Sequence, residues 1–293
     1  MPDTHKTFYV TTAIPYVTAK PHLGHVLEWF QADALARYHS LLGKKVAFAS
    51  GADENSLKNV QAAEKAGMKT QAFLDKYAAI FEEAYQKFGI SLTHFRRGSD
   101  EELHWPGVQK LWQKCDASGD IYKKRYQGLY CVGCESFYTE DELVDGKCPE
   151  HPNQTPELVE EENYFFRLSK YEAQIKKLIT SNELKIVSEQ FRNEMLGFIE
   201  NGLENFSISR SKKRARGVGV PVPNDPEQIM YVWFDALNIY MTAIGFGLDE
   251  TQWQEFWPAD LHVIGKGINR FHSVYWIGML LSAGLPTPKA ISV

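Results

Sequence analysis

Strand-like and helix-like segments alternate at both ends of this chain, and the alternation decides more about its fold than any other feature of the sequence. Apolar residues recur at helical spacing in some segments, and short β-rich runs lie between them. Strands separated by helices imply βαβ units, which build a parallel sheet. We predict strands over residues 7–13, 46–49, 231–236, 261–264 and 290–293, and helices over residues 24–42, 55–66, 73–88 and 270–283.

The alternation stops near residue 118 and resumes near residue 229. Residues 119–160 are rich in turns and contain three of the four cysteines, and a helical stretch follows over residues 168–203. With 293 residues, the chain exceeds one average domain. We therefore predict a nucleotide-binding α/β domain in two halves, separated by an insertion. The two halves and the insertion cover residues 1–117, 229–293 and 118–228.

Composition narrows the class of protein. Apolar residues make up 44% and charged residues 24%, so disordered and collagen-like chains are excluded. No run of roughly 18 apolar residues occurs, and the first residues lack the layout of a signal or transit peptide. We therefore expect a cytoplasmic protein with no membrane partner. The net charge of −5 argues against a surface coated in basic charge for duplex nucleic acid.

The tetrapeptide HLGH at residues 22–25 follows a predicted strand and loop and opens a predicted helix. Doubly wound sheets bind nucleotides at that position. Gly24 lets a phosphate approach the backbone, and the free N–H groups of the first helical turn favour an anion. His22 and His25 add two donors that suit charge stabilisation on a transferring phosphoryl group. The alternative is a pair of histidines of which one caps the helix and the other packs.

Three cysteines and a histidine have the spacing of a zinc site, Cys131-x2-Cys134-x13-Cys148-x2-His151. In a chain without a secretion signal, such a cluster indicates metal binding rather than disulfides. Four protein ligands leave no position for water or substrate, so we predict one structural Zn²⁺ in a knuckle over about residues 128–152. The alternative is two incidental cysteine pairs in a flexible loop.

Aromatic residues gather in two late segments, YVWFDALNIY at 231–240 and FHSVYW at 271–276. They indicate either an apolar pocket with a polar tip or ordinary aromatic core. Asp53 follows the second predicted strand, where parallel sheets usually hold ligands. Its carboxylate would pair with an amine there. The alternative is an N-cap for the helix that starts near residue 55.

One strongly basic run, Arg210-Ser-Lys-Lys-Arg-Ala-Arg216, stands in an otherwise acidic chain. Five basic residues in seven suit contact with a phosphodiester backbone. The alternative is a solvated loop.

Together, these motifs resemble those of the methionyl-tRNA synthetases, a family of class I aminoacyl-tRNA synthetases, in the bacterial form. The segments that carry the resemblance are TTAIPYVTAKPHLGHVLEWFQAD, the GADE turn, CVGC, CPEH, NYFFRLSKY, YVWFDA, and GK-x-I followed by FHSVYW. They span essentially the whole chain in the family's order. The resemblance implies a Rossmann-like catalytic domain that is split by an α+β connective-peptide insertion with a zinc knuckle.

The resemblance also implies roles for single residues. His22 and His25 would be catalytic, and Asp53 would bind the α-ammonium group of methionine. The nucleotide would contact His22, Gly24, His25, Glu28, Gly265, Gly267 and Ile268. The methionine would contact Ile14, Tyr16, Asp53, Trp233, Ala236, Leu237, Tyr240, Ile268, His272, Tyr275 and Trp276. The metal ligands would be Cys131, Cys134, Cys148 and His151.

By the same resemblance, the chain would activate L-methionine with Mg²⁺-ATP to methionyl-adenylate and transfer it to the acceptor end of tRNA(Met). The carboxylate of methionine is the nucleophile, so the reaction needs no general base. The protein would contribute orientation and charge stabilisation.

Three features depart from the family pattern. The family's Lys-Met-Ser-Lys-Ser loop and helical anticodon-binding domain would follow residue 293, so we expect a catalytic core without them. GADENS stands where the family usually has Asp-Glu-His-Gly. Gly267 stands where an acidic residue that contacts the ribose is typical.

These departures leave a second hypothesis, a catalytically deficient, truncated homologue that acts as a methionine- or tRNA-binding module. A third hypothesis is a small-molecule nucleotidyltransferase, because that class shares a similar His-x-Gly-His turn. Those proteins lack a large zinc-bearing insertion, so the cysteine cluster at residues 131–151 argues against the third hypothesis.

Overall fold

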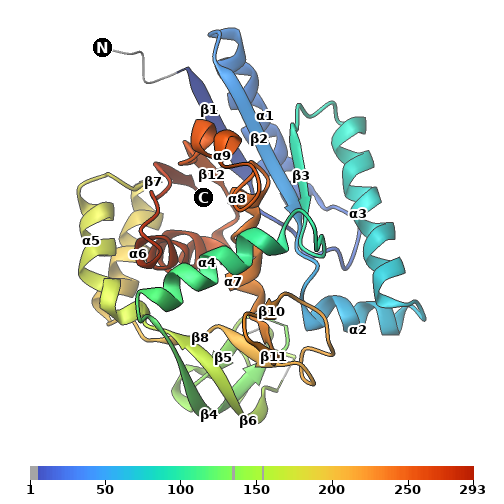
Figure 1. Cartoon of the computed structure of the whole chain (residues 1–293), viewed down its shortest axis with the longest axis vertical. Helices are drawn as coiled ribbons and strands as arrows, with labels where there is room; N and C mark the ends of the chain where they lie inside the picture. The colour runs from blue at the N-terminus through green and yellow to red at the C-terminus, as the bar shows by residue number, and fades with distance from the viewer. Residues whose placement is uncertain (1–5, 134–135, 154) are drawn as a thin grey trace.

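The computed structural model describes residues 6–133, 136–153 and 155–293. Within these ranges, six strands form a parallel sheet in the order β3-β2-β1-β12-β13-β7 (Figure 1). The α/β prediction with a parallel sheet is therefore confirmed. The strands of this sheet are β1 (Thr7–Thr12), β2 (Lys45–Ala52), β3 (His94–Arg97), β7 (Lys185–Val187), β12 (Leu261–Val263) and β13 (Ala290–Ser292).

Helices connect these strands and pack on the sheet. The α-helices are α1 (Leu23–Leu41), α2 (Leu57–Lys65), α3 (Thr70–Lys87), α4 (Trp105–Ala117), α5 (Glu172–Thr180), α6 (Glu189–Glu200), α7 (Val232–Ala236), α8 (Ile239–Thr242), α9 (Glu250–Phe256) and α10 (Trp276–Ser282). The shorter helical turns are η1 (Glu140–Glu142), η2 (Leu168–Tyr171), η3 (Lys266–Ile268) and the π-helical η4 (Phe271–Tyr275).

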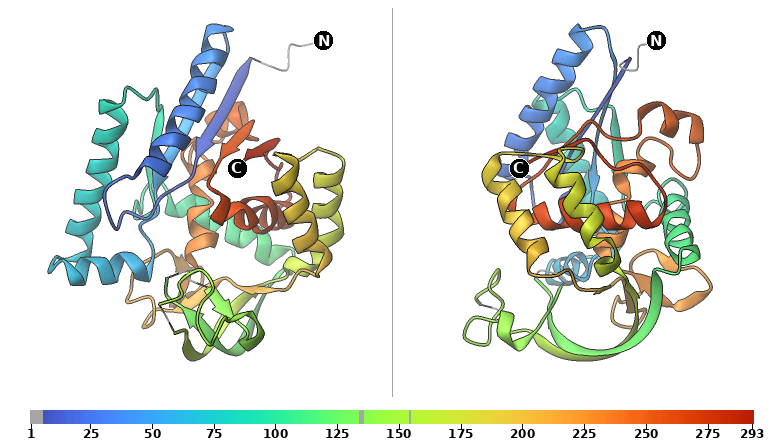
Figure 2. Two further views of the ribbon diagram at one scale, coloured as in Figure 1. Left: turned by 180° about the vertical axis from the view of Figure 1, so that it is seen from behind. Right: turned by 90° about the vertical axis from the view of Figure 1, so that its left-hand side faces the viewer.

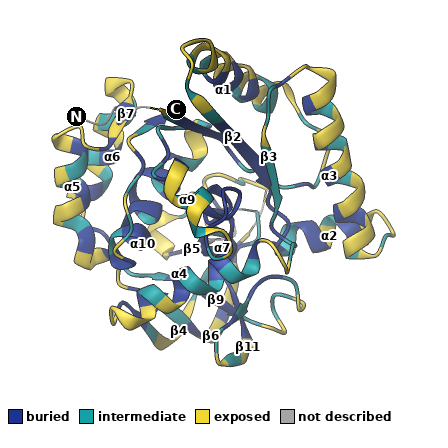
Figure 3. Cartoon of the chain, turned by 45° about the horizontal axis from the view of Figure 1, so that its top comes forward, coloured by how far each residue is buried: buried dark blue, intermediate teal, exposed yellow. Residues whose placement is uncertain are grey.

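Alternate residues of β1 and β2 point to opposite faces of the sheet. The sheet therefore has one core cluster on each face. Phe8 and Phe48 pack with residues of α1 and α3 on one face. Tyr9 and Ala47 pack into a larger cluster with residues of α4, α8 and α10 on the other face. The outer surfaces of α1 and α3 are largely exposed, whereas α7 is largely buried (Figure 3). The residues of α8 are buried as well.

The two ends of the chain build one sheet. β1, β2 and β3 come from the first hundred residues, and β12 and β13 come from the last forty (Figure 2). β1 pairs in parallel with β12, with Val10 opposite Leu261. The sheet therefore joins the two segments that the sequence predicts as halves of one domain.

The edge strand β7 comes from the middle of the chain. Ile186 of β7 pairs in parallel with Ile291 of β13, and Ile175 of α5 and Ile199 of α6 enter the larger core cluster. The helical stretch predicted over residues 168–203 is confirmed by η2, α5 and α6, but β7 interrupts it. A strand of three residues is too short to show a period of two within a helical pattern.

Antiparallel strands from the middle of the chain form two smaller sheets at one end of the molecule (Figure 1). The strand orders are β5-β4-β6-β8 and β10-β11-β9. The strands are β4 (Ile121–Cys131), β5 (Ser136–Tyr138), β6 (Glu157–Phe166), β8 (Phe206–Ser207), β9 (Ser209–Ser211), β10 (Pro221–Val222) and β11 (Asp225–Met230).

The strand predicted over residues 231–236 is also wrong, because α7 covers Val232–Ala236. Its residues YVWFDA are β-branched or aromatic in the main and are therefore typical of strands. Four of the five α7 residues are buried, so no polar face gives the helix an amphipathic period. The helix predicted over residues 270–283 is confirmed, with a π-helical first turn.

None of the helices within the described ranges combines the length and the apolar character that crossing a bilayer requires.

Candidate active site

The loops that follow β1, β2 and β12 meet at one edge of the parallel sheet, because the carboxyl ends of parallel strands lie together. They lead to His22, to Asp53 and to Gly265. The backbone N–H of Asp53 donates to the carbonyl of Pro15 at 2.9 Å, and Tyr16 pairs with Asp53 in a parallel bridge. Two segments predicted to bind methionine, around Tyr16 and Asp53, are therefore adjacent.

His22 and His25 close the first turn of α1 by capping it. Nδ1 of His22 accepts hydrogen bonds from the backbone N–H of Gly24 at 3.1 Å and of His25 at 3.4 Å. Nδ1 of His25 accepts one from the backbone N–H of His22 at 3.3 Å. A Cβ at Gly24 would lie 2.9 Å from the His22 ring, so a larger residue would disturb this cap.

The capping bonds settle the tautomers of both imidazoles. Because Nδ1 accepts in each ring, Nε2 carries the proton in each neutral ring. The two rings stack with their centroids 3.7 Å apart. Burial, followed by the charge of His22, lowers the pKa of His25 to about 4, so His25 is neutral at pH 7. Both histidines therefore cap the helix, whereas the alternative had one capping and the other packing. Capping uses Nδ1 of each ring and leaves each Nε2–H as a donor for a ligand.

Glu28 lies one helical turn after His25 and beside the loop that follows β12. A Cβ at Gly265 would lie 3.3 Å from Oε1 of Glu28, so this close approach suits a glycine. Burial raises the pKa of Glu28 to about 7, although a hydrogen bond from the backbone of Ala13 opposes the rise. Glu28 therefore has a carboxyl group that titrates near neutral pH at the predicted nucleotide site.

Asp53 lies in a turn of four buried polar residues, 53–56, at the end of β2. Its side chain is not the N-cap of α2, so the capping alternative is wrong for this residue. Ser56 is the cap, and its Oγ accepts from the backbone N–H of Asn59 at 3.2 Å. Asn59 in turn donates through Nδ2 to the carbonyl of Asp53 at 2.8 Å.

Two buried polar side chains lie among the aromatic residues of the predicted methionine pocket. Nδ1–H of His272 donates to the carbonyl of Ile268 at 2.9 Å, so Nε2 of His272 accepts from the hydroxyl of Tyr240 at 2.7 Å. Burial lowers the pKa of His272 to about 4. Trp233 stacks on Phe271 with ring centroids 4.0 Å apart.

A cavity of about 880 Å³ brings together four of the residues predicted to bind methionine or nucleotide. They are Tyr16, Trp233, Gly267 and Ile268, and the cavity extends to Gly133 and His151 of the predicted zinc knuckle and to α6. Asp53 lies outside the lining but pairs with Tyr16, which belongs to it. His22 and His25 also lie outside the lining.

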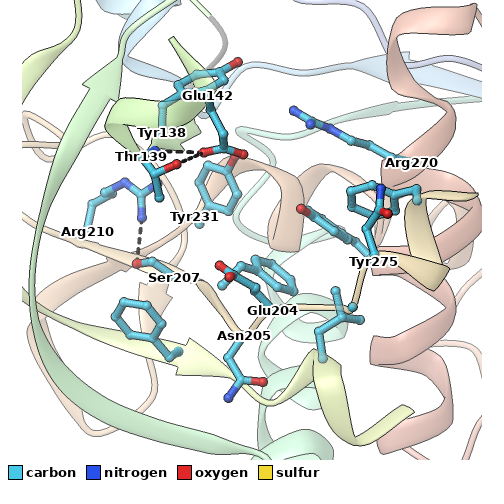
Figure 4. A pocket seen from close by; sticks show the side chains of 16 residues that line it. Tyr138, Thr139, Glu142, Glu204, Asn205, Ser207, Arg210, Tyr231, Arg270 and Tyr275 are labelled. Atoms are coloured by element: carbon cyan, nitrogen blue, oxygen red, sulfur yellow. Dashed lines mark hydrogen bonds between the residues drawn. The ribbon is translucent and has the colours of Figure 1, made fainter. Parts of the chain in front are cut away.

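A second cavity of about 420 Å³ adjoins the first, and Arg270 lines both (Figure 4). Tyr275, predicted to contact methionine, lines this second cavity and stacks on Phe206 with ring centroids 4.5 Å apart. Trp276 is fully buried against Trp257 instead. Leu237 and Tyr240 are buried in the larger core cluster, and Ala236 is buried as well. Ile14 and His272 pack beside that cluster.

Three of the four predicted metal ligands converge. Nδ1 of His151 lies 3.9 Å from Sγ of Cys131 and 3.9 Å from Sγ of Cys148, and all three ligand atoms lie within 4.8 Å of one another. Both cysteines are buried. Cys134 lies outside the described residues.

Known proteins are similar to this chain over nearly its whole length. Residues 8–154 and 150–293 match the family described as tRNA synthetases class I (M). The chain belongs to this family. It is 44% identical over 288 residues to the methionine–tRNA ligase of Thermotoga maritima, covering 97% of this chain and 45% of that protein. It is 42% identical to the ligase of Caldanaerobacter subterraneus, covering 98% and 44%. The chain spans about half the length of the curated relatives it matches.

Solved structures of the family have the same fold. The Mycobacterium tuberculosis methionyl-tRNA synthetase in complex with methionyl-adenylate superposes with a TM-score of 0.93 at 41% identity, covering 98% of this chain and 57% of that one. The apo form of the same enzyme gives a TM-score of 0.84 at 36% identity, covering 100% and 56%. This member of the family is therefore more similar to the adenylate-bound structure than to the free one.

The basic residues of the run at 210–216 lie in different environments in this family member. Arg210 is buried, and Arg210 and Arg214 lie over the ring of Tyr130. Arg216 forms an ion pair with Glu64. Lys212 and Lys213 are exposed. The solvated-loop alternative therefore holds for Lys212, Lys213 and Arg216, which are all exposed, and not for Arg210, which is buried.

Sequence reasoning missed one polar residue beside the predicted methionine pocket. Asp235 lies in α7, two residues after Trp233, and is 1% exposed. Its position inside the aromatic segment YVWFDA indicates a buried polar partner, because a charged residue inside an apolar run is buried only when it is paired.

Proposed function

We propose that this chain is the catalytic core of a methionine–tRNA ligase, which activates L-methionine with Mg²⁺-ATP to methionyl-adenylate. One observation carries the proposal. The capped imidazoles of α1, the carboxylate of Asp53 and the cavity lined by Trp233 and Ile268 lie at the same edge of one parallel sheet. The similarity to an adenylate-bound structure at a TM-score of 0.93 supports it.

The amino-acid part of the site would hold methionine by its two ends. Asp53 would pair with the α-ammonium group, which leaves the carboxylate of methionine to attack the α-phosphate of ATP. The thioether would lie against Trp233, Tyr16 and Ile268, because sulfur gains from aromatic contacts. One methylene changes binding in an apolar pocket by only about 1–3 kcal/mol, so rejection of homocysteine by binding alone would be incomplete.

The nucleotide part of the site would act by charge stabilisation. Nε2–H of His22 and of His25 would donate to the phosphoryl oxygens as charge develops, without a covalent step. Gly24, Glu28, Gly265, Gly267 and Ile268 would contact the nucleotide. Mg²⁺ would enter with ATP and neutralise phosphate charge.

We extend the proposal to the second half-reaction, in which the acceptor end of tRNA(Met) takes the methionyl group. Support comes from the family, class I tRNA synthetases (M). The antiparallel strands within residues 118–228 would then belong to the connective-peptide insertion. From the same range, β7, α5 and α6 pack with the parallel sheet and would belong to the catalytic domain, together with residues 1–117 and 229–293.

The insertion would carry one structural Zn²⁺ on Cys131, Cys134, Cys148 and His151. A tetrahedral site with Zn–S bonds of about 2.3 Å and Zn–N bonds of about 2.0 Å places a nitrogen and a sulfur ligand about 3.5 Å apart. His151 Nδ1 lies 3.9 Å from each described cysteine sulfur, so a small inward movement of the side chains would close the site around the ion. Elemental analysis should find about one zinc per chain, and Cys148→Ser should lose it. A metal-free native chain would refute this part.

Methionine-dependent exchange of pyrophosphate into ATP tests the proposed activation step. We expect exchange with L-methionine and none with leucine or isoleucine at equal concentration. Exchange with a different amino acid would overturn the proposal.

A methionine-binding module without chemistry is the second candidate, and Gly267 favours it. A Cβ at this position would meet no atom within 4 Å, so an acidic side chain would fit where the family typically has one. Calorimetry that shows methionine binding, together with an absence of adenylate, would select this candidate.

A further inference from the structure

A buried carboxylate joins three segments around the proposed methionine site. Oδ2 of Asp235 accepts from Nδ2 of Asn55 at 2.6 Å, and Oδ1 accepts from Nε2 of His104 at 2.6 Å. The side chain of His104 is 0% exposed and that of Asp235 is 2% exposed. These residues come from the loop after β2, from the start of α4 and from α7. We call Asn55, His104 and Asp235 the Asp235 network.

The other hydrogen bonds of the network keep each partner in one orientation. Nδ2 of Asn55 also donates to the carbonyl of Gly98 at 2.6 Å. Nδ1 of His104 accepts from the hydroxyl of Thr242 at 2.7 Å, so its Nε2–H donates to Asp235. A buried carboxylate with two short hydrogen bonds resists displacement, because leaving either bond unmade costs free energy.

The network connects the two residues that would contact opposite ends of methionine. Asn55 lies two residues after Asp53 in the same buried turn, and Asp235 lies two residues after Trp233 in α7. A hydrogen bond between residues 55 and 235 therefore sets the separation between the carboxylate of Asp53 and the ring of Trp233. A displacement of about 1 Å in such a site lowers activity about 100-fold.

We propose that Asp235 is a positioning residue that, through Asn55, holds Asp53 and Trp233 at the spacing that methionine requires. The inference rests on the proposed function, since it takes methionine as the ligand.

The test compares two buried aspartates in the full chain. Asp235→Asn replaces one of the two accepting oxygens by an amide N–H, so Asn55 and His104 can no longer both donate to it, and Asn55→Leu removes one donor at similar volume. Asp33→Asn is the matched control, because Asp33 is 6% exposed and accepts from Arg37 and Ser91 at 2.7 Å, on the part of α1 away from the pocket. Calorimetry measures the Kd for L-methionine and for ATP, and thermal unfolding measures Tm.

We expect Tm to fall in both Asp235→Asn and Asp33→Asn. Of these two variants, only Asp235→Asn should raise the Kd for methionine, by about 10-fold. The Kd for ATP should change less than about 2-fold. Asn55→Leu should weaken methionine binding similarly, and the double variant should be no worse than the worse single variant, because both changes remove one interaction. Additive effects, or equal methionine affinity in Asp235→Asn and Asp33→Asn, would overturn the inference.

A measurement without ligand separates this inference from the proposed function. In chains labelled with 5-fluorotryptophan, the ¹⁹F resonance of Trp233, assigned with Trp233→Phe, should shift in Asp235→Asn and Asn55→Leu but not in Asp33→Asn. An unshifted resonance overturns the inference even if the chain forms methionyl-adenylate. A shifted resonance in a chain that forms no adenylate supports the inference and counts against the proposed function.

Discussion

The nucleotide end and the methionine end of the candidate site use histidine in opposite ways. At the nucleotide end, Nδ1 of His22 and of His25 accepts backbone hydrogen bonds, which leaves Nε2–H as a donor in each ring. At the methionine end, Nδ1–H of His272 donates to the carbonyl of Ile268, which leaves Nε2 as an acceptor for Tyr240. His22 is exposed and His272 is 1% exposed.

The two hydrogen-bonding arrangements suit the histidine side chain to two different tasks. Donors fixed in advance and open to solvent stabilise charge on an incoming anion. A buried imidazole whose hydrogen bonds are all internal presents little charge to an apolar ligand and stays neutral, as the lowered pKa of His272 indicates. Local backbone contacts, and not the residue type, decide which task each histidine suits.

The largest expected effect concerns the donors at the nucleotide end. His25→Asn keeps an oxygen near the position of Nδ1 for the cap but removes the Nε2–H donor. The rate of methionyl-adenylate formation should fall about 100- to 1000-fold, with methionine affinity unchanged. His25→Gln, whose amide N–H lies near the position of Nε2, should retain more of the rate. Equal losses in both variants would show that the cap, and not the donor, matters.

The second largest effect is expected at the methionine end of the site, where a substitution should weaken methionine binding. Asp53→Asn removes the negative charge that would pair with the α-ammonium group, and the Kd for methionine should rise about 100-fold. The Kd for ATP should stay within about 3-fold. Calorimetry with each ligand separately measures both. Equal effects on the two ligands would mean that the turn at residue 53 is structural.

The third prediction concerns pH at the nucleotide end. The folded-state pKa of Glu28 is about 7, above its ordinary value of 4.5. Its contribution to stability is therefore present below about pH 4.5 and is lost as the pH rises through 7. Glu28→Gln removes this loss, so the variant should match the native chain at pH 4.5 and exceed its stability by ~1–2 kcal/mol at pH 8.

Urea unfolding of both chains at the two pH values measures this difference. A stability gain that is the same at both pH values would show that the titration of Glu28 plays no part.

The smallest expected effect concerns the buried pair at the methionine end. Tyr240→Phe leaves Nε2 of His272 without its donor, which should lower the free energy of unfolding by about 1–2 kcal/mol. The Kd for methionine should rise only about 5-fold, because the ring remains. Unfolding and calorimetry measure the two quantities. A larger effect on methionine than at Asp53 would place the ligand's charged group beside Tyr240.

Much of the parallel sheet could be predicted from the sequence, because its strands and helices have clear periods. Residues 24–42, 55–66 and 73–88 correspond to α1, α2 and α3, and residues 261–264 and 290–293 to β12 and β13. Two of the failures, at β7 and α7, fall where a period is absent. β7 has three residues, and α7 is buried on nearly all sides.

The candidate site was predictable only in part. Spacing alone identified His22, His25 and the cysteines as candidates, because those motifs are local. The pairing of Asp235 with Asn55 and His104 joins residues 131 to 180 positions apart, which no local pattern reveals. Trp276 and Tyr275 are neighbours in sequence, yet one is buried against Trp257 and the other lines the second cavity, because a helix directs adjacent side chains to different sides.

Binding of a stable sulfamoyl analogue of methionyl-adenylate tests most directly whether one crevice holds both ligands. If the methionine and nucleotide ends are adjacent, linking the two ligands should give a Kd at least about 100-fold below that of either methionine or ATP alone. Asp53→Asn and His25→Asn should each weaken binding of the analogue. A Kd no lower than that of the better single ligand would contradict a shared site.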